Sequence, residues 1–183
     1  MAAQAPAGDP DRLASVDGIV ARLARGLVER CRQLSSEIAA VDKELQVLVR
    51  PLAPALLAVC GCATITAAKL VGETADVRRF RSRHAYARHN GTAPLPVWSG
   101  NHDRHRLSRA GNRQLNAAIH CVAITQAHYH PDARAFLERR RAAGDSKAES
   151  IRALKRRLSD VIYRALLLDA ELDSQPPTVL VVA

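Results

Sequence analysis

The stretch VWSGNHDRHRLSRAGNRQLN, residues 97–116, sets two serines into a run of arginine and histidine. Ser99 stands beside Gly100, Ser108 comes shortly before Gly111, and Asp103 is the one acidic residue of the stretch. A serine hydroxyl becomes a nucleophile when another group accepts its proton, and positive charge stabilises a reacting phosphate. These residue types therefore suit the binding of a phosphate group, or chemistry on it.

Positive charge extends over a longer part of the chain. Residues 78–113 hold nine arginines and four histidines. The chain has a net charge of +9, residues 1–50 are balanced, and all seven histidines follow residue 50. Such a density of like charge repels itself unless a polyanion neutralises it. We expect a neutral part for protein contact and a basic part that binds a polyanion; a solvated basic face or a generally arginine-rich genome is the alternative.

Other chemistry is conceivable at the same residues. The pairs His102-x-x-His105 and His128-x-His130 could hold a metal, but no cysteine lies at a useful spacing. Ser99, His102 and Asp103 have the residue types of a hydrolytic triad, although so tight a loop triplet rarely has triad geometry. The scattered acidic residues form no cluster for a catalytic metal. The four cysteines contain no CxxC pair, and we expect buried free thiols.

The N-terminal part carries an apolar seven-residue repeat. Apolar residues recur at Leu13, Val20, Leu27, Leu34, Val41 and Leu48, with a second set at Val16, Leu23, Cys31, Ile38 and Leu45. One narrow apolar seam on so long a helix needs a partner helix. After a disordered lead over residues 1–10, the pattern predicts a coiled-coil arm over residues 11–50, with copies of the chain associating through residues 11–49. The alternative is a long helix packed on its own domain.

Residues 51–172 are expected to form a compact helical domain, with a flexible tail at 173–183. Pro51 and Pro54 should end the arm. Residues 55–73 indicate two short helices joined at Gly61, with Thr64 as a cap and Gly72 as an end of the second. This pair resembles a helix-hairpin-helix, whose turn amides approach a DNA phosphate, and a plain αα-hairpin fits the spacing equally well.

The rest of the domain completes an all-α fold. The other predicted helices cover residues 82–89, 112–128, 132–143 and 146–170. Ser82 is a cap, Asn90-Gly91 is a stop signal, and Ser146 with Glu149 fits a capping box. Prolines, glycines and polar residues predict a loop over 94–110. The expected apolar stripes are Leu115, Ile119, Val122 and Ala123, and Ile151, Leu154, Leu158, Val161, Ile162, Ala165 and Leu168.

The order of the motifs resembles one known family. In sequence they are an apolar helix with a glycine turn (59–68), Val71-Gly72-Glu73, Arg79-Phe80, Asn90-Gly91, Pro94, Ser99-Gly100 and S-R-A-G-N-R-Q-L (108–115), followed by a final pair of helices. Over about residues 52–170 this order is similar to the C-terminal transposase domain of the DEDD/serine insertion-sequence transposases, a family related to the Piv DNA invertases. A preceding coiled coil belongs to the same layout.

The resemblance implies DNA transposition by site-specific recombination, with the serine of the SG pair, here Ser99, as the catalytic nucleophile. Its attack would form a covalent serine–DNA phosphodiester that a free DNA end later reverses. Ser108 is the competing serine, and its place before Gly111 suits capping or phosphate contact better. His102 or His105 could relay a proton.

Arginines would neutralise the phosphate at which Ser99 reacts. Arg104, Arg106 and Arg109 could stabilise the phosphorane, and Gly100 would let the backbone approach the substrate closely. The residues expected to contact DNA are Arg79, Arg81, Arg83, Arg88, Arg104, Arg106, Ser108, Arg109, Asn112 and Arg113.

The family's N-terminal half is a RuvC-like domain whose four acidic residues bind Mg²⁺, and the 183 residues contain none of it. We therefore expect a truncated transposase that holds no cofactor or metal itself and is inactive alone. A separate RuvC-like half and a structured guide RNA are further candidate partners.

Two other classes of function remain open. One is a non-catalytic protein that dimerises through residues 11–49 and binds DNA through 78–113, and the other is a structural coiled-coil protein. The sequence shows no signal-peptide pattern and no apolar run long enough for a membrane span, so we expect a cytoplasmic, nucleoid-associated bacterial protein.

Overall fold

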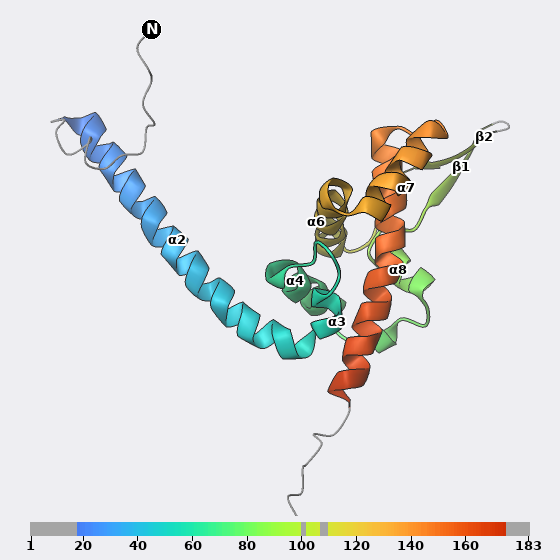
Figure 1. The fold of residues 1–183 in the computed structure, drawn as a ribbon, viewed down its shortest axis with the longest axis horizontal. Helices are drawn as coiled ribbons and strands as arrows, with labels where there is room; N and C mark the ends of the chain where they lie inside the picture. Colours follow the sequence, from blue (N-terminus) through green and yellow to red (C-terminus); the bar gives the residue numbers. More distant parts are fainter. Residues whose placement is uncertain (1–17, 100–101, 107–109, 175–183) are drawn as a thin grey trace, which may run out of the picture. The chain divides into compact units, whose positions relative to one another are not determined.

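The computed structural model describes residues 18–99, 102–106 and 110–174. Its elements (Figure 1) are α2 (Ile19–Leu52), α3 (Pro54–Leu57), α4 (Thr64–Thr74), the 3₁₀ turn η1 (Val77–Arg79), α5 (Arg83–His89), β1 (Leu95–Ser99), β2 (His102–Arg106), α6 (Arg113–Tyr129), α7 (Pro131–Ala142) and α8 (Lys147–Asp173). The predicted all-α fold is confirmed, with one β-hairpin added to it. Residues 1–10, expected to be disordered, and 175–183 of the expected flexible tail lie outside the described residues. The tail was expected to start at residue 173, but Asp173 still belongs to α8 and Ser174 is its C-cap.

The chain divides into two units, residues 1–44 and residues 45–183. Helix α2 runs without interruption from the first unit to the start of the second (Figure 1). The predicted long N-terminal helix is therefore confirmed. Its apolar seam faces solvent: Val20 is 81% exposed, Leu27 68% and Ile38 64%. Whether two such seams pair as a coiled coil stays a prediction.

The end of α2 differs from the expectation, because the helix includes Pro51 and ends at Leu52. Proline lacks an N–H and hinders the preceding turn, so it is tolerated near a terminus. The helical bonding continues past it, since the Ala53 N–H donates to the Val49 carbonyl at 2.9 Å. Pro54 then opens α3, where its missing N–H is not needed.

The short helix α3 is capped by a residue far away in sequence. The carboxylate of Asp169, on α8, accepts from the Ala55 N–H at 2.7 Å and from the Leu56 N–H at 3.1 Å. Asp169 is 5% exposed. A carboxylate on the first N–H groups of a helix satisfies donors that have no partner within that helix. Asp169 therefore joins the start of the second unit to its last helix.

Helix α4 begins at Thr64, as expected, and ends later than expected. Its N-cap is Ala63, with no side-chain cap, so Thr64 is already its first helical residue, and it continues through Gly72 to Thr74. The turn before it has Gly61 at φ +84, and a Cβ there would lie 3.0 Å from the Thr125 Cβ of α6. This turn packs on α6, and DNA contact through it stays a prediction.

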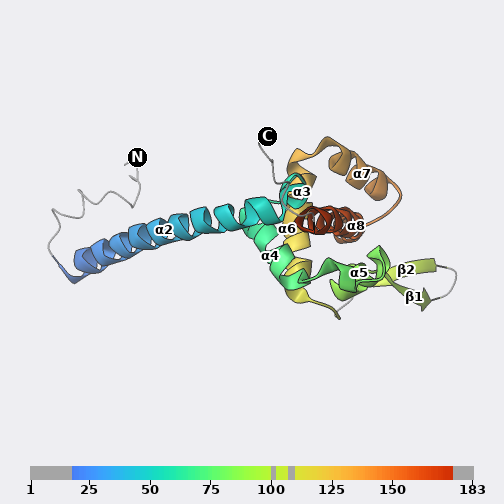
Figure 2. The same cartoon turned by 90° about the horizontal axis from the view of Figure 1, so that it is seen from below.

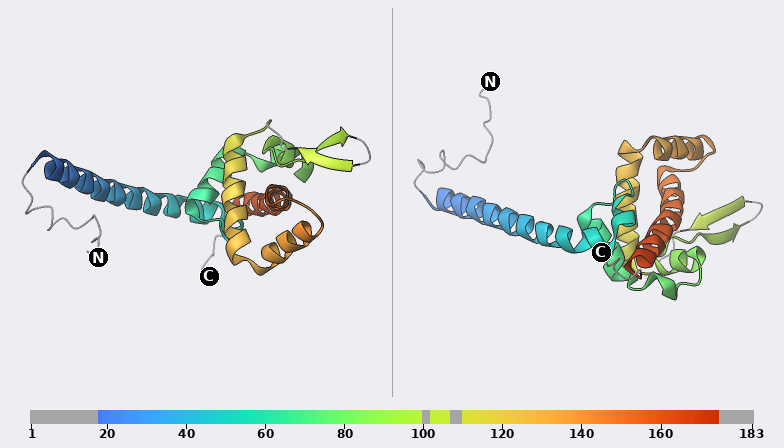
Figure 3. Two further views of the ribbon diagram at one scale, coloured as in Figure 1. Left: turned by 90° about the horizontal axis from the view of Figure 1, so that it is seen from above. Right: turned by 60° about the horizontal axis from the view of Figure 1, so that its bottom comes forward.

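The core of the second unit lies among helices α3 to α8, with α8 packed against α3, α5, α6 and α7 (Figures 2 and 3). The predicted stripe of α6 is confirmed, because Leu115, Ile119, Val122 and Ala123 have no exposed surface. The stripe of α8 is confirmed except at two positions, Val161 and Leu168, which are exposed. The cysteine expectation holds for Cys62 alone: Cys31, Cys60 and Cys121 are exposed, and all four are free.

The predicted loop at 94–110 is wrong over most of its length. Residues 95–99 and 102–106 form an antiparallel hairpin, in which Leu95 pairs with Arg106 and Ser99 with His102. Backbone pairing between two extended segments outweighs the turn-forming composition of this stretch.

Candidate nucleic-acid interface

The two ends of the hairpin segment meet at one point of the second unit. The Asn112 N–H donates to the His89 carbonyl at 2.6 Å. Gly91 and Gly111 both have positive φ, +70 and +100, and a Cβ on Gly111 would lie 2.7 Å from the Gly91 nitrogen and from the His89 carbonyl oxygen. A side chain at Gly111 would therefore collide with backbone. These two glycines let the chain leave α5 and return to α6 at the same place.

Side-chain amides fasten this point to the core. Asn90 is fully buried and donates to the Ser159 hydroxyl at 2.8 Å, while Thr92 donates to the Asn90 side-chain oxygen. The Asn116 amide donates to the Asn90 carbonyl at 2.8 Å, and Lys155 donates to the Asn116 oxygen. Buried polar groups that are fully hydrogen-bonded rigidify a site. The base of the hairpin is thus fixed through both α6 and α8.

The register of the hairpin decides which positions belong together. Ser99 pairs with His102, Val97 with Arg104 and Leu95 with Arg106. Paired positions and every second position along a strand share one face of a two-stranded ribbon. Positions 99, 104 and 106 therefore lie on one face of the hairpin. The other two expected phosphate contacts of this segment, Ser108 and Arg109, lie outside the described residues.

Arginines surround η1 and α5. Arg79 lies over the Phe80 ring, 4.5 Å from its centroid, and its Nη2 is 3.2 Å from the His89 Nε2. Burial, and then the charge of Arg79, lower the pKa of His89, while Glu73 opposes this shift. Arg81, Arg83 and Arg88 are exposed. The Ser82 hydroxyl accepts from the Ala85 N–H, so the predicted cap of α5 is confirmed.

At the start of α6, the two expected DNA contacts have different surroundings. The Asn112 side-chain oxygen accepts from the Gln114 and Leu115 N–H groups, and its amide donates to Glu73 at 2.7 Å. Asn112 is thus already engaged as the N-cap of α6. Arg113 is exposed.

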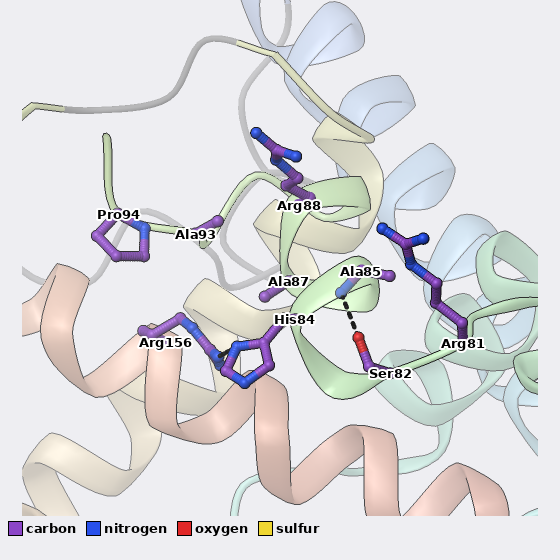
Figure 4. A pocket seen from close by; sticks show the side chains of 9 residues that line it. All are labelled: Arg81, Ser82, His84, Ala85, Ala87, Arg88, Ala93, Pro94 and Arg156. Carbon is purple, nitrogen blue, oxygen red and sulfur yellow. Dashed lines mark hydrogen bonds between the residues drawn. The ribbon is translucent and has the colours of Figure 1, made fainter. Parts of the chain in front are cut away.

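A hollow of about 410 Å³ opens beside α5 (Figure 4). It is lined by Arg81, Ser82, His84, Ala85, Ala87, Arg88, Ala93, Pro94 and Arg156. Two of the arginines expected to bind DNA line it together. Arg156, on α8, was not expected from the sequence, because its place on an amphipathic helix is typical of a solvated arginine. Its Nη2 is 3.1 Å from the His84 Nδ1, and it forms an ion pair with Asp160.

Two further findings concern metals and membranes. Among the described residues there is no group of three or more His, Cys, Asp or Glu side chains that could hold a metal ion. None of the helices in the described ranges combines the length and apolar content that a membrane span requires.

Comparison with known proteins finds similarity to one transposase family. A model of the transposase IS116/IS110/IS902 family matches residues 53–138, which include η1, α5, the hairpin and α6. The chain is also similar to the insertion element IS110 uncharacterized 43.6 kDa protein of Streptomyces coelicolor, with 30% identity over 157 residues. This match covers 83% of the chain and 37% of that relative. The chain thus spans little more than a third of the length of the curated relative.

The expected resemblance to insertion-sequence transposases is confirmed at the level of this family. The relation to the DEDD/serine enzymes and to the Piv invertases stays a prediction, as does the truncation. Residues 53–138 are similar to the transposase IS116/IS110/IS902 family, whose model they match.

Proposed function

We propose that this chain binds DNA in transposition and carries the serine nucleophile of the strand exchange, Ser99. The observation that carries the proposal is the hairpin register, which sets positions 99, 104 and 106 on one face above a fixed base. A serine and two arginines at positions on one face can supply the nucleophile and part of the charge stabilisation of a phosphoryl transfer. The family match supports the same reaction class.

The chemistry would be a transesterification. The Ser99 oxygen attacks the phosphorus of a DNA phosphodiester, a bond from that oxygen to phosphorus forms, and the bond to one deoxyribose oxygen breaks. The serine proton passes to a base, for which His102 is the candidate because its position pairs with that of Ser99, whereas position 105 lies on the opposite face. The leaving deoxyribose oxygen takes up a proton. A free DNA end reverses the step. Arg104, Arg106 and Arg109 would stabilise the negative charge on the phosphorane.

Mg²⁺ is implied by the resemblance and would be held by acidic residues of a RuvC-like domain. When bound there, it would polarise the phosphate oxygens. The described residues of this chain offer no cluster for it. We therefore assign to this chain the binding and positioning of DNA and the serine, and to a separate RuvC-like half the metal. A structured guide RNA is a further candidate partner.

Association with a second copy would proceed through residues 11–49. The support is the exposed apolar seam of α2, in which Val20, Leu27 and Ile38 have more than half of their surface in solvent. Pairing two such seams removes this surface from water. A dimer would bring two basic surfaces to one DNA molecule and raise the effective concentration of each.

A second candidate function is DNA binding without chemistry. It is favoured by the exposed arginines Arg81, Arg83, Arg88 and Arg113, which bind phosphate without any contribution from Ser99. A third candidate, a purely structural coiled-coil protein, would require neither the exposed arginines nor Ser99. The salt dependence of DNA affinity separates the second from the third, because phosphate contacts release counterions.

The deciding experiment incubates the purified chain with supercoiled DNA carrying the ends of the element, with and without a supplied RuvC-like half. Denaturing gels then detect a covalent protein–DNA adduct. We expect Ser99→Ala to abolish the adduct and the matched variant Ser108→Ala to retain it. The reverse pattern would move the nucleophile to Ser108. No adduct, with DNA binding that weakens steeply with salt, would establish the non-catalytic function.

A further inference from the structure

We propose that the hollow beside α5 binds one phosphodiester group of a nucleic-acid strand, and that His84 and Arg156 take part in that binding. The inference rests on the proposed function, since it assumes that a nucleic acid lies along this surface. It adds a specific site to it, in which His84 and Arg156, neither of them expected from the sequence, join Arg81 and Arg88.

The charge of the hollow is the first argument. The nine described residues that line it include three arginines and one histidine, and neither Asp nor Glu. Among the described residues, Arg81 and Arg88 have no acidic partner. An anion that enters the hollow is therefore attracted by two uncompensated guanidinium groups. Arginine also presents a planar set of donors that matches the oxygens of a phosphate.

The second argument is that Arg156 is held in place before any ligand binds. Its ion pair with Asp160, one helical turn further along α8, fixes one side of the guanidinium, and His84 contacts another. Its side chain is 20% exposed, so it lies in the wall of the hollow. A side chain that is already ordered loses less rotamer entropy when a ligand binds.

The contact between Arg156 and His84 also assigns the hydrogen of the imidazole. A guanidinium has donors alone, so Nη2 donates and Nδ1 of His84 accepts. The neutral ring then carries its hydrogen on Nε2, which is available as a donor to a phosphate oxygen. Figure 4 shows the His84 ring beside the Arg156 side chain at the hollow.

The size and position of the hollow fit this ligand. A volume of about 410 Å³ exceeds what one phosphate fills and leaves space for an adjoining sugar. Ala93 and Pro94 at its rim lead directly into β1, which ends at Ser99. Five strand residues at about 3.3 Å each span roughly 17 Å. A phosphate in the hollow would thus set how a strand lies along the hairpin, a few nucleotides from the position at Ser99.

The test compares Arg156→Gln with a matched control, Arg164→Gln, which removes one arginine from the same helix outside the hollow. Affinity of the full chain for a short fluorescein-labelled DNA duplex is measured by anisotropy between about 50 mM and 200 mM salt. We expect Arg156→Gln to weaken binding about tenfold, because a hydrogen bond to a charged group is lost. The slope of log K against log[salt] should fall by about one. Arg164→Gln should weaken binding about twofold or less, as a distant screened charge does.

Equal losses in the two variants would overturn the phosphodiester site and leave the proposed function intact. A wild-type chain that fails to bind duplex would instead overturn the proposed function, and the site with it. Near-UV circular dichroism checks that each variant is folded. If Arg156→Gln is not, Arg81→Gln, on the segment before α5, provides the same comparison. An RNA strand of the same sequence, run in parallel, shows from which nucleic acid the phosphodiester comes.

A second readout tests the contact itself. The side-chain nitrogen signals of His84 are followed by NMR while the full chain is titrated with the dinucleotide dTpT or with thymidine. We expect dTpT, which has one phosphodiester, to shift the Nε2 signal, and thymidine, which has none, to leave it unchanged. The shift should be lost in Arg156→Gln. Equal responses to dTpT and thymidine, or none to dTpT, would contradict the proposal.

Discussion

Helices α2 and α6 both carry an apolar stripe at helical spacing, and the two stripes have opposite surroundings. In α6, Ile119 and Val122 have no exposed surface, whereas in α2 Leu27 is 68% exposed and Ile38 64%. The stripe of α6 is covered by α4 and α8 of the same unit. A pattern of apolar residues thus identifies the face that will be buried and leaves open which chain buries it.

The two helices should therefore respond differently to protein concentration. Packing of α6 is intramolecular and independent of protein concentration. Association through α2 would depend on concentration, as for any dimer. The packing of α6 can be followed separately, because all aromatic residues of the chain follow residue 50. Near-UV circular dichroism therefore reports the second unit alone.

The largest effect is expected at the buried stripe. Ile119→Ala should lower the free energy of unfolding of the second unit by about 3 kcal/mol, through lost burial and a remaining cavity. Ile124→Ala, on the same helix, is the control, because Ile124 is 37% exposed. It should cost about 1 kcal/mol or less. Urea unfolding followed by near-UV circular dichroism measures both, and similar losses would show that α6 is not packed as described.

Gly111→Ala should lower the free energy of unfolding of the second unit by about 2 kcal/mol. A Cβ at this positive φ is strained and would also meet the backbone of Gly91 and His89. Gly72→Ala is the contrasting variant. Gly72 lies inside α4, and a Cβ added there would meet no neighbouring group within 4 Å. Alanine there should raise the free energy of unfolding by about 0.5–1 kcal/mol. The same urea titration tests whether the two substitutions act in opposite directions.

A substitution in the exposed seam of α2 should weaken self-association and leave the stability of the second unit unchanged. Ile38→Lys is expected to raise the dissociation constant of self-association about tenfold, because it sets charges into the seam. The unfolding midpoint of the second unit should not move. Ser36→Lys adds the same charge on the opposite side of the helix and should have little effect on either. Sedimentation equilibrium measures the association. A chain that is monomeric at all concentrations would contradict pairing through α2.

The smallest effect is a dependence on pH. The pKa of His89 is lowered by burial and then by Arg79, and that of His120 by burial and then by Lys155. Both folded pKa values lie below the ordinary value of 6.5, so the unfolded chain binds more protons as the pH falls through 6.5. Stability of the second unit is therefore full above this pH and should decline below it.

The arm provides the contrast for this measurement. Residues 1–50 contain no histidine, so self-association should change little between about pH 7.5 and about pH 5.5. Replacing His89 and His120 together by Gln should flatten the decline for the second unit. A decline that persists in this double variant would assign it to other groups.

Local signals in the sequence predicted much of this fold. Ser82 and Ser146 each cap a helix as expected, and Ser146 with Glu149 forms the predicted capping box. These interactions are made between residues close in sequence, so the pattern of residue types contains them. The stripe of α6 was predictable for the same reason.

The β-hairpin was missed although it has a short-range signal. Ser99 and His102 are paired, which leaves Gly-Asn between them in the sequence, and this dipeptide is typical of two-residue hairpin loops. The prolines and polar residues on either side of this dipeptide led to the prediction of a loop. The caps and contacts between distant residues had no such signal. Asp169 on the N–H groups of α3 and Arg156 at the hollow depend on how α8 packs, which periodicity does not specify.

The meeting of Gly91 with Gly111 makes residues 92–110 an insertion with a closed base. The cost in chain entropy of lengthening such a segment grows slowly, by about 0.6 kcal/mol for each doubling. Evolution can therefore exchange or resize this hairpin while the helices that carry it keep their packing. Diversification could then proceed in one small module while the scaffold stays unchanged.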